Sequence, residues 1–414
     1  DITDLENPEL LWEFSAPGLG FASTGPAIIR INARSTEYAN LPDKDRNGRW
    51  FAIFVSGPTG PIDTVERQFK GYSDQNLKLF VVDVKDGTLV RTIDTGITNA
   101  FGGSLFTAAT DFDIDYQDDV IYIGYTKSED AKPTAATQWT EGGVIRLVTG
   151  EDRRGTAFNW TDTALNPDNW VWSHVIENTG ATTSGVTHLT SYQKRPRPGA
   201  KSTITSGRLF FGTGRYFFKG DDSLSQRRLY GIKEPCLTAV STSCTRDASL
   251  SSYFCSACLT DTGLTVDKGT LTDQTTTVTS TVDHGWYIDL DGATAERVIT
   301  DPVAIPNGAV FFTSFDPNMD ICSYGGSTYV WAVDYKTGGS VSLRGKALLQ
   351  VSTGAIKEMD LKETKPGEPD SEPTFSGRGN RRTTAIEGVP PPDQGLLIMV
   401  PPPSVDTTIH IQKK

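Results

Sequence analysis

Four aspartates and a glutamine recur at odd positions of one short acidic stretch. Asp111, Asp113, Asp115 and Asp119 occupy its positions one, three, five and nine, and Gln117 at position seven can offer its backbone carbonyl. This is the order in which a calcium-binding loop presents its oxygen ligands. Carboxylates held this close repel one another, and a hard cation offsets the repulsion. The spacing therefore predicts a Ca²⁺ site made by these five residues.

The chain that follows the loop distinguishes the predicted site from an EF-hand. The bidentate glutamate of an EF-hand would fall at Tyr122, and the apolar run from Val120 to Gly124 predicts a strand instead of an exiting helix. Asp119 must then close the ligand shell. Tyr116 stands where such loops usually place glycine, and a left-handed turn there would cost a bulky residue about 1–3 kcal/mol. The alternative interpretation is a solvated acidic turn in an acidic protein.

A second acidic turn, residues 43–48, begins like a calcium loop. Phe51 occupies its ninth position, however, and Lys44, Arg46 and Arg49 dilute its charge. Because a metal loop needs oxygen ligands at these positions, we interpret this segment as a hairpin turn without a metal.

Five cysteines indicate an oxidising compartment. Four of them lie within a Thr/Ser-rich stretch that a hydrophobic core alone would stabilise poorly, so local disulfides are expected there. The pairing is open, with one thiol left over: Cys236, Cys244, Cys255, Cys258 and Cys322. A structural zinc site is the rival interpretation, but there is a single C-x-x-C pair and no histidine close to it.

The composition is that of a soluble globular protein rich in turns. The chain has 414 residues with 40 glycines and 23 prolines, and its formal net charge is −12. Nucleic acids and anionic membranes would be repelled by this charge, so neither is an expected partner. We find no apolar run long enough for membrane insertion and no signal peptide at the amino terminus, which suggests a processed or truncated chain.

A repeated pattern of short strands predicts an all-β fold, a β-propeller over residues 1–414. The repeat consists of an apolar run, a turn with aspartate and glycine, and a second alternating run; its best copies are residues 77–93 and 328–339. Units of this kind, about four in number, resemble propeller blades whose packed faces hide sheet edges. Two regions break the pattern and are expected to be loop insertions: residues 217–280, rich in Cys and Thr, and residues 357–388, charged and rich in Gly and Pro.

A series of motifs in this order resembles the carboxy-terminal propeller of the PilY family, the tip-associated adhesins and assembly factors of bacterial type IV pili. Each motif is short, and together they extend over most of the chain: LLWEFSAPGLG (10–20), the acidic loop running into VIYIG (111–124), FFGTGRY (210–216), RLYGI (228–232), GWYIDL (285–290), VITDP (298–302), VFFTSF (310–315) and YVWAVD (329–334).

The resemblance implies a seven-bladed modified propeller with quinoprotein-like repeats, of which this chain would supply about four blades. The remainder would come from an upstream segment of the same protein or from a separate chain. The resemblance also implies export to the surface of a Gram-negative bacterium and a place at the pilus tip with the minor pilins. The implied roles are pilus biogenesis, including the balance of extension and retraction, adhesion to a host or abiotic surface, and surface sensing, with Ca²⁺ on Asp111–Asp119.

We expect the protein not to be an enzyme. A quinoprotein dehydrogenase that uses PQQ would share the propeller repeats and a calcium ion, but its adjacent cysteine pair is missing, and the acidic cluster lies within one loop. A hydrolase is disfavoured because there is no G-x-S-x-G elbow to pair with the 4 histidines. A third possibility is a structural module in which calcium only staples a hairpin.

Overall fold

The structure of the chain is a computed structural model. It describes residues 6–31, 49–60, 69–105, 109–111, 118–130, 139, 141–149, 166–178, 185–193, 207–217, 221, 226–237, 265–291, 294–318, 322, 324–341, 343, 345–361, 374–391 and 396–399. Within these residues no helix is long and apolar enough to cross a membrane.

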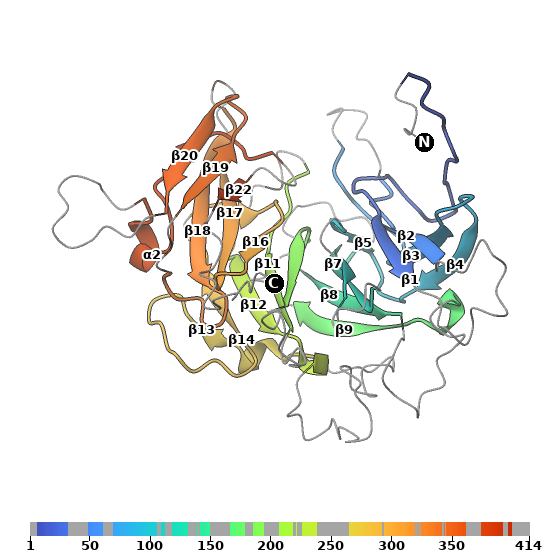
Figure 1. Cartoon of the computed structure of the whole chain (residues 1–414), viewed down its shortest axis with the longest axis horizontal. Helices are drawn as coiled ribbons and strands as arrows, with labels where there is room; N and C mark the ends of the chain where they lie inside the picture. The colour runs from blue at the N-terminus through green and yellow to red at the C-terminus, as the bar shows by residue number, and fades with distance from the viewer. Residues whose placement is uncertain are drawn as a thin grey trace, which may run out of the picture.

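The described residues form five β-sheets that follow one another along the chain (Figure 1). The first sheet contains β1 (Ala27–Ile31), β2 (Arg49–Val55), β3 (Lys78–Asp83) and β4 (Leu89–Asp94). The second contains β5 (Ala100–Gly102), β6 (Ala109–Thr110), β7 (Val120–Lys127), β8 (Glu141–Val148) and β9 (Val171–Asn178). The third contains β10 (Leu189–Gln193), β11 (Gly207–Gly212), β12 (Arg228–Lys233), β13 (Thr272–Asp273) and β14 (Gly285–Asp289).

The fourth and fifth sheets complete the series. The fourth contains β15 (Arg297–Val298), β16 (Val303–Ile305), β17 (Ala309–Pro317), β18 (Gly326–Asp334) and β21 (Ile386–Glu387). The fifth contains β19 (Lys346–Gln350), β20 (Ile356–Asp360) and β22 (Leu396–Met399). Helical segments in the described part are single turns: η3 (Pro167–Asn169), η5 (Pro235–Leu237), η7 (Lys268–Thr270) and α2 (Gly377–Asn380). The expected all-β fold is confirmed.

The sheets are stacked face to face, because successive residues of their central strands are apolar. In β17, Val310 and Phe312 face the third sheet, whereas Ala309 and Phe311 face the fifth sheet. Side chains alternate across a strand, so a strand buried on both faces needs an apolar residue at every position. An apolar cluster of this kind fills each interface between consecutive sheets.

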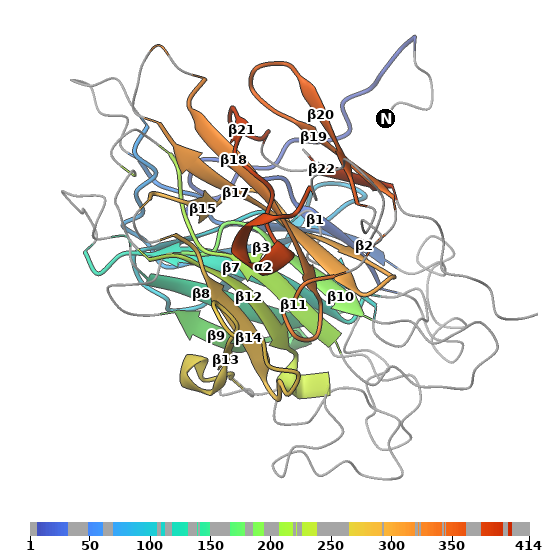
Figure 2. The same cartoon turned by 90° about the vertical axis from the view of Figure 1, so that its left-hand side faces the viewer.

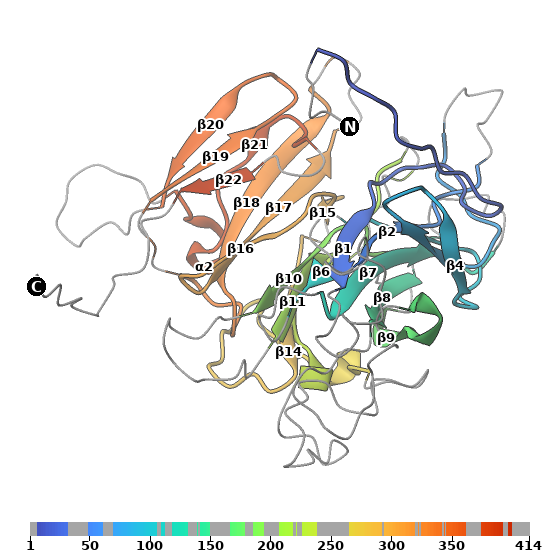
Figure 3. The same cartoon turned by 45° about the vertical axis from the view of Figure 1, so that its right-hand side comes forward.

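The resulting array has its first two sheets on one side, its last two on the other and the third between them (Figure 1). Turned by 90°, the fourth and fifth sheets stand in front of the rest (Figure 2). The leading strands β1, β6, β10 and β16 contact one another in the middle of the molecule (Figure 3). The sequence repeats predict about four units, while the described residues form five sheets; the closed seven-bladed ring stays a prediction.

Part of each expected insertion belongs to a sheet. Within residues 217–280, β12 is a central strand of the third sheet and pairs with β11 and β14. Its buried Leu229 and Ile232 lie on opposite faces of the strand, each in an apolar cluster with a neighbouring sheet. Residues 357–388 likewise include most of β20 and all of β21. Residues 238–264 and 362–373 lie outside the described residues.

Candidate functional site

The predicted calcium loop connects two hydrogen-bonded strands of the second sheet. β6 pairs antiparallel with β7 through Thr110 opposite Val120, and the Asp119 N–H donates to the Thr110 carbonyl at 3.0 Å. Asp111 and Asp119, the first and last predicted ligands, therefore directly adjoin the pair that closes the hairpin. Asp111 is partly buried and Asp119 is buried. The other three predicted ligands, Asp113, Asp115 and Gln117, lie outside the described residues, as does Tyr116.

Asp118 anchors the base of the loop to the first sheet. Its carboxylate Oδ2 accepts the N–H of Arg30 in β1 at 2.9 Å, and its own N–H donates to the Arg30 carbonyl at 3.1 Å. Thr149, after β8, donates its N–H to the Asp119 carbonyl at 3.0 Å and its hydroxyl to the Asp118 carbonyl at 2.9 Å. Arg30 of the first sheet and Thr149 after β8 thus fix the carboxyl-terminal end of the loop. The sequence spacing already left Asp118 out of the ligand set, and this contact explains its separate role.

Tyr122, at the position of the EF-hand glutamate, lies in strand β7. It is fully buried in the apolar cluster between the second and third sheets. Burial, followed by the nearby charge of Glu234, raises the pKa of the Tyr122 hydroxyl well above its usual value. A neutral phenol in the core cannot replace a carboxylate ligand, so the departure from the EF-hand pattern is confirmed at this residue.

The cysteines are placed only in part. Cys236 is buried, and its N–H donates to Glu234 Oε1 at 3.0 Å. Cys322 is exposed. The local disulfides stay a prediction, because the remaining three cysteines lie outside the described residues: Cys244, Cys255 and Cys258.

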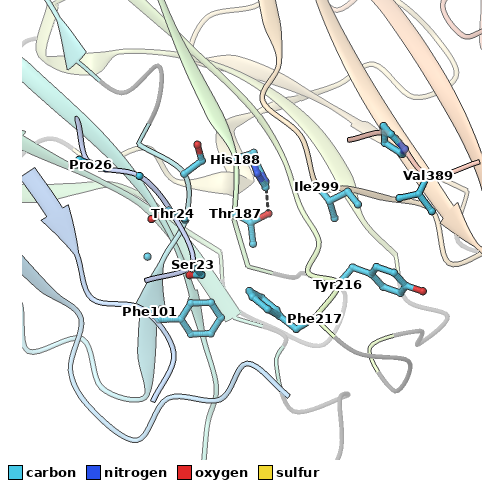
Figure 4. A pocket seen from close by; sticks show the side chains of 15 residues that line it. Ser23, Thr24, Pro26, Phe101, Thr187, His188, Tyr216, Phe217, Ile299 and Val389 are labelled. Atoms are coloured by element: carbon cyan, nitrogen blue, oxygen red, sulfur yellow. Dashed lines mark hydrogen bonds between the residues drawn. The ribbon is translucent and has the colours of Figure 1, made fainter. Parts of the chain in front are cut away.

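A cavity of about 450 Å³ lies where segments from the first four sheets converge (Figure 4). Residues 23–26 precede β1, residues 101–104 continue from β5, and residues 187–188 precede β10. Residues 216–217, after β11, and Ile299, after β15, complete much of the wall. Sequence reasoning missed this cavity, because its residues are far apart in the chain and follow no common motif.

Two kinds of comparison relate the chain to known proteins. No protein-family model matches it. The chain is 24% identical over 356 residues, 80% of its length, to a protein of Xylella fastidiosa named "Type IV pilus biogenesis factor PilY1 homolog". It is 25% identical over 370 residues, 83% of its length, to "Type IV pilus biogenesis factor PilY1" of Pseudomonas aeruginosa. The chain spans 20% and 28%, respectively, of the lengths of these relatives.

The same relationship is found in three dimensions. The crystal structure of the Pseudomonas aeruginosa PilY1 C-terminal domain matches 94% of this chain and 71% of that domain, with a TM-score of 0.57 and 18% sequence identity. The two proteins therefore share a fold. The chain is thus similar in sequence to PilY1 proteins over four fifths of its length and similar in fold to the PilY1 carboxy-terminal domain.

Proposed function

We propose that the chain is a non-enzymatic, calcium-binding component of the type IV pilus tip that acts in pilus biogenesis. The observation that carries the proposal is the match to proteins named pilus biogenesis factors over 80–83% of the chain. A protein with this role is exported and works at the cell surface, with the minor pilins of the tip complex as partners. The proposal extends to adhesion to a host or abiotic surface and to surface sensing, which the family resemblance implies.

The geometry of the acidic hairpin supports the calcium part of the proposal. The β6–β7 pair brings Asp111 and Asp119, the first and last predicted ligands, to the same end of the hairpin. Asp119 is 7% exposed, and a buried carboxylate is stabilised by a cation or by hydrogen-bond donors. Oxygen donors alone make up the predicted ligand set, as a hard cation such as Ca²⁺ prefers.

The fold supports a further part of the proposal, that these sheets are blades of a ring completed by additional sheets of the same protein. Both ends of the array carry exposed apolar side chains on their outer faces. Ile28 and Trp50 lie on the first sheet, and Ile356, Leu397 and Met399 lie on the fifth. A neighbouring blade would cover such faces, as the clusters between the five sheets do.

Thermal unfolding of the purified chain tests the calcium site. We expect Ca²⁺ to raise the unfolding midpoint and Mg²⁺ or a chelator not to, because a ligand stabilises the state that binds it, by about 2.7 kcal/mol at a hundredfold excess over Kd. Asp115→Ala should abolish the shift. Asp45→Ala, which removes a carboxylate from the second acidic turn, should keep it. A midpoint that ignores Ca²⁺, or a shift that survives Asp115→Ala, would refute the assignment of the loop.

Complementation of a bacterial strain that lacks the gene for this protein tests its role. The wild-type gene should restore surface pili and twitching, and the Asp115→Ala variant should alter both while the protein remains folded. Normal piliation with Asp115→Ala, despite the loss of Ca²⁺ stabilisation, would identify the calcium as a structural staple only. Normal piliation in the strain that lacks the gene would refute the pilus assignment.

A further inference from the structure

We propose that the cavity at the centre of the array binds a neutral saccharide of one or two rings. This inference is independent of the calcium loop and of the pilus assignment, because it depends on the wall of the cavity alone. The cavity volume of about 450 Å³ falls within the range of small-molecule sites, roughly 300–1,000 Å³.

The wall combines aromatic rings with hydroxyl groups, which is the chemistry that a sugar ring requires. Tyr216 and Phe217 are partly exposed, and Phe101 packs behind Phe217 with its ring centroid 5.4 Å away. Such faces suit the C–H side of a pyranose. Figure 4 shows Thr187 and His188 near these rings, with 2.9 Å between Thr187 Oγ1 and His188 Nδ1. Hydroxyl and imidazole groups can both donate and accept, as sugar hydroxyls do.

The wall lacks the groups that a charged ligand needs. None of the described residues that line the cavity is Lys, Arg, Asp or Glu. Arg215 and Arg297 lie against the rings of Phe217 and Tyr216, but their guanidinium groups donate to backbone carbonyls. A phosphate or carboxylate in this space would lose its hydration without a cation on the wall itself, which is unfavourable. The carboxylate of Asp301 is hydrogen-bonded to the wall, since Ser104 Oγ donates to Asp301 Oδ2 at 3.2 Å. The lining therefore selects a ligand that is polar but uncharged.

The cavity is preformed, because hydrogen bonds within and between sheets fix its wall. The Ser104 N–H donates to the Thr187 carbonyl at 2.6 Å, and the Gly103 N–H donates to the Gly124 carbonyl at 2.8 Å. Thr187 Oγ1 donates to the Gly214 carbonyl at 3.4 Å. The Ser104 bond joins the second sheet to the third, and the other two bonds fix the wall within each of these sheets. A wall that is fixed before binding reduces the entropic cost of holding a small ligand.

Gly25 offers a way to block the cavity without disturbing the fold. It lines the cavity, and a Cβ built on it would meet no atom within 4 Å. Leucine at this position should therefore occupy part of the ligand space while the packed residues stay in place. Thr277 is exposed and does not line the cavity, so Thr277→Leu is a matched control for an added leucine.

The test is saturation-transfer NMR and titration calorimetry on the purified 414-residue chain. The neutral probes are methyl α-glucoside, methyl β-galactoside, methyl α-mannoside, N-acetylglucosamine and lactose; the charged probes are glucose 6-phosphate and N-acetylneuraminic acid. We expect at least one neutral probe to bind with Kd on the order of 1 mM, as suits a small ligand. Gly25→Leu and His188→Ala should each weaken it tenfold or more, with unfolding midpoints near the wild type.

Three outcomes would overturn the proposal. The first is that no neutral probe binds the wild-type chain. The second is that a neutral probe binds but folded Gly25→Leu retains its affinity, which would place the ligand elsewhere. The third is that the charged probes bind as tightly as the neutral ones. Unchanged affinity in Thr277→Leu, together with the losses in the two cavity variants, would support the proposal.

Discussion

Replacing Glu234 by glutamine should destabilise the contact between the second and third sheets. The side chains of Glu234 and Arg146 are both 0% exposed, and Arg146 Nη2 lies 3.1 Å from Glu234 Oε1. The pair joins β8 to the chain that follows β12. Arg146 Nη1 also donates to Ser173 Oγ at 3.1 Å, so the guanidinium is held within the second sheet.

The expected loss follows from the burial of both charges. Removing one partner of a buried ion pair leaves the other charge without compensation and without water, which typically costs about 3–5 kcal/mol. Glutamine keeps the size of the side chain and can still accept the Cys236 N–H, which bonds to Glu234 Oε1 at 3.0 Å. We therefore expect Glu234→Gln to lower the free energy of unfolding by about 3 kcal/mol, at the low end of that range.

Urea denaturation, followed by tryptophan fluorescence, measures this loss against a matched variant. Glu358→Gln removes the same charge from the ion pair with Lys346 on the fifth sheet, where the two side chains are 56% and 52% exposed. Solvent screens that pair, so its loss should change stability far less than the loss of the buried pair. Equal effects of the two substitutions would refute the reasoning, because they would mean that burial does not control the strength of the pair at Glu234.

Two further substitutions test other parts of the structure. Burial lowers the pKa of His174, so the unfolded chain takes up the proton at a higher pH than the folded chain does. Stability should therefore fall as the pH drops below about 6.5. His174→Gln should reduce the fall in unfolding midpoint between pH 7.5 and 5, and an unchanged fall would contradict this. A Cβ on Gly103 would lie 2.2 Å from the Thr187 carbonyl oxygen, so Gly103→Ala should lower the free energy of unfolding in urea by about 1–3 kcal/mol. Gly25→Ala should leave it unchanged, because a Cβ there meets no atom within 4 Å. Equal midpoints for the two variants would exclude the clash.

The sequence predicts the central strands well, because their signal is local. The apolar run 120–124 and the first part of the repeat 328–339 correspond to β7 and β18, and these strand predictions are confirmed. Each run is apolar at consecutive positions, and both of its faces are buried between sheets. The edges of the expected insertions were harder to place, since β12 lies among polar residues and its side chains are buried by the sheets on either side of the third sheet.

Contacts between distant parts of the chain could not be predicted from spacing. Asp118 and Asp119 are neighbours of the same type; the odd-position spacing assigns Asp119 to the predicted ligand set but gives Asp118 no role. The fold gives it one by placing Arg30, 88 residues away, against the carboxylate of Asp118. Similarly, a histidine such as His188 looks like any strand residue until the fold surrounds it with segments of four sheets.

The cavity arises where the regular pattern of the strands is interrupted. β5 and β6 both pair with β7, and β15 and β16 both pair with β17, so the innermost strand is broken in two sheets. At one break Gly103 allows the close approach of a neighbouring sheet, and at the other Asp301 reaches Ser104, 197 residues away. A continuous strand would direct its backbone groups to its neighbour and leave no such space. Glycine- and proline-containing breaks in the innermost strands are therefore where a ligand site should first be sought in a fold of this kind.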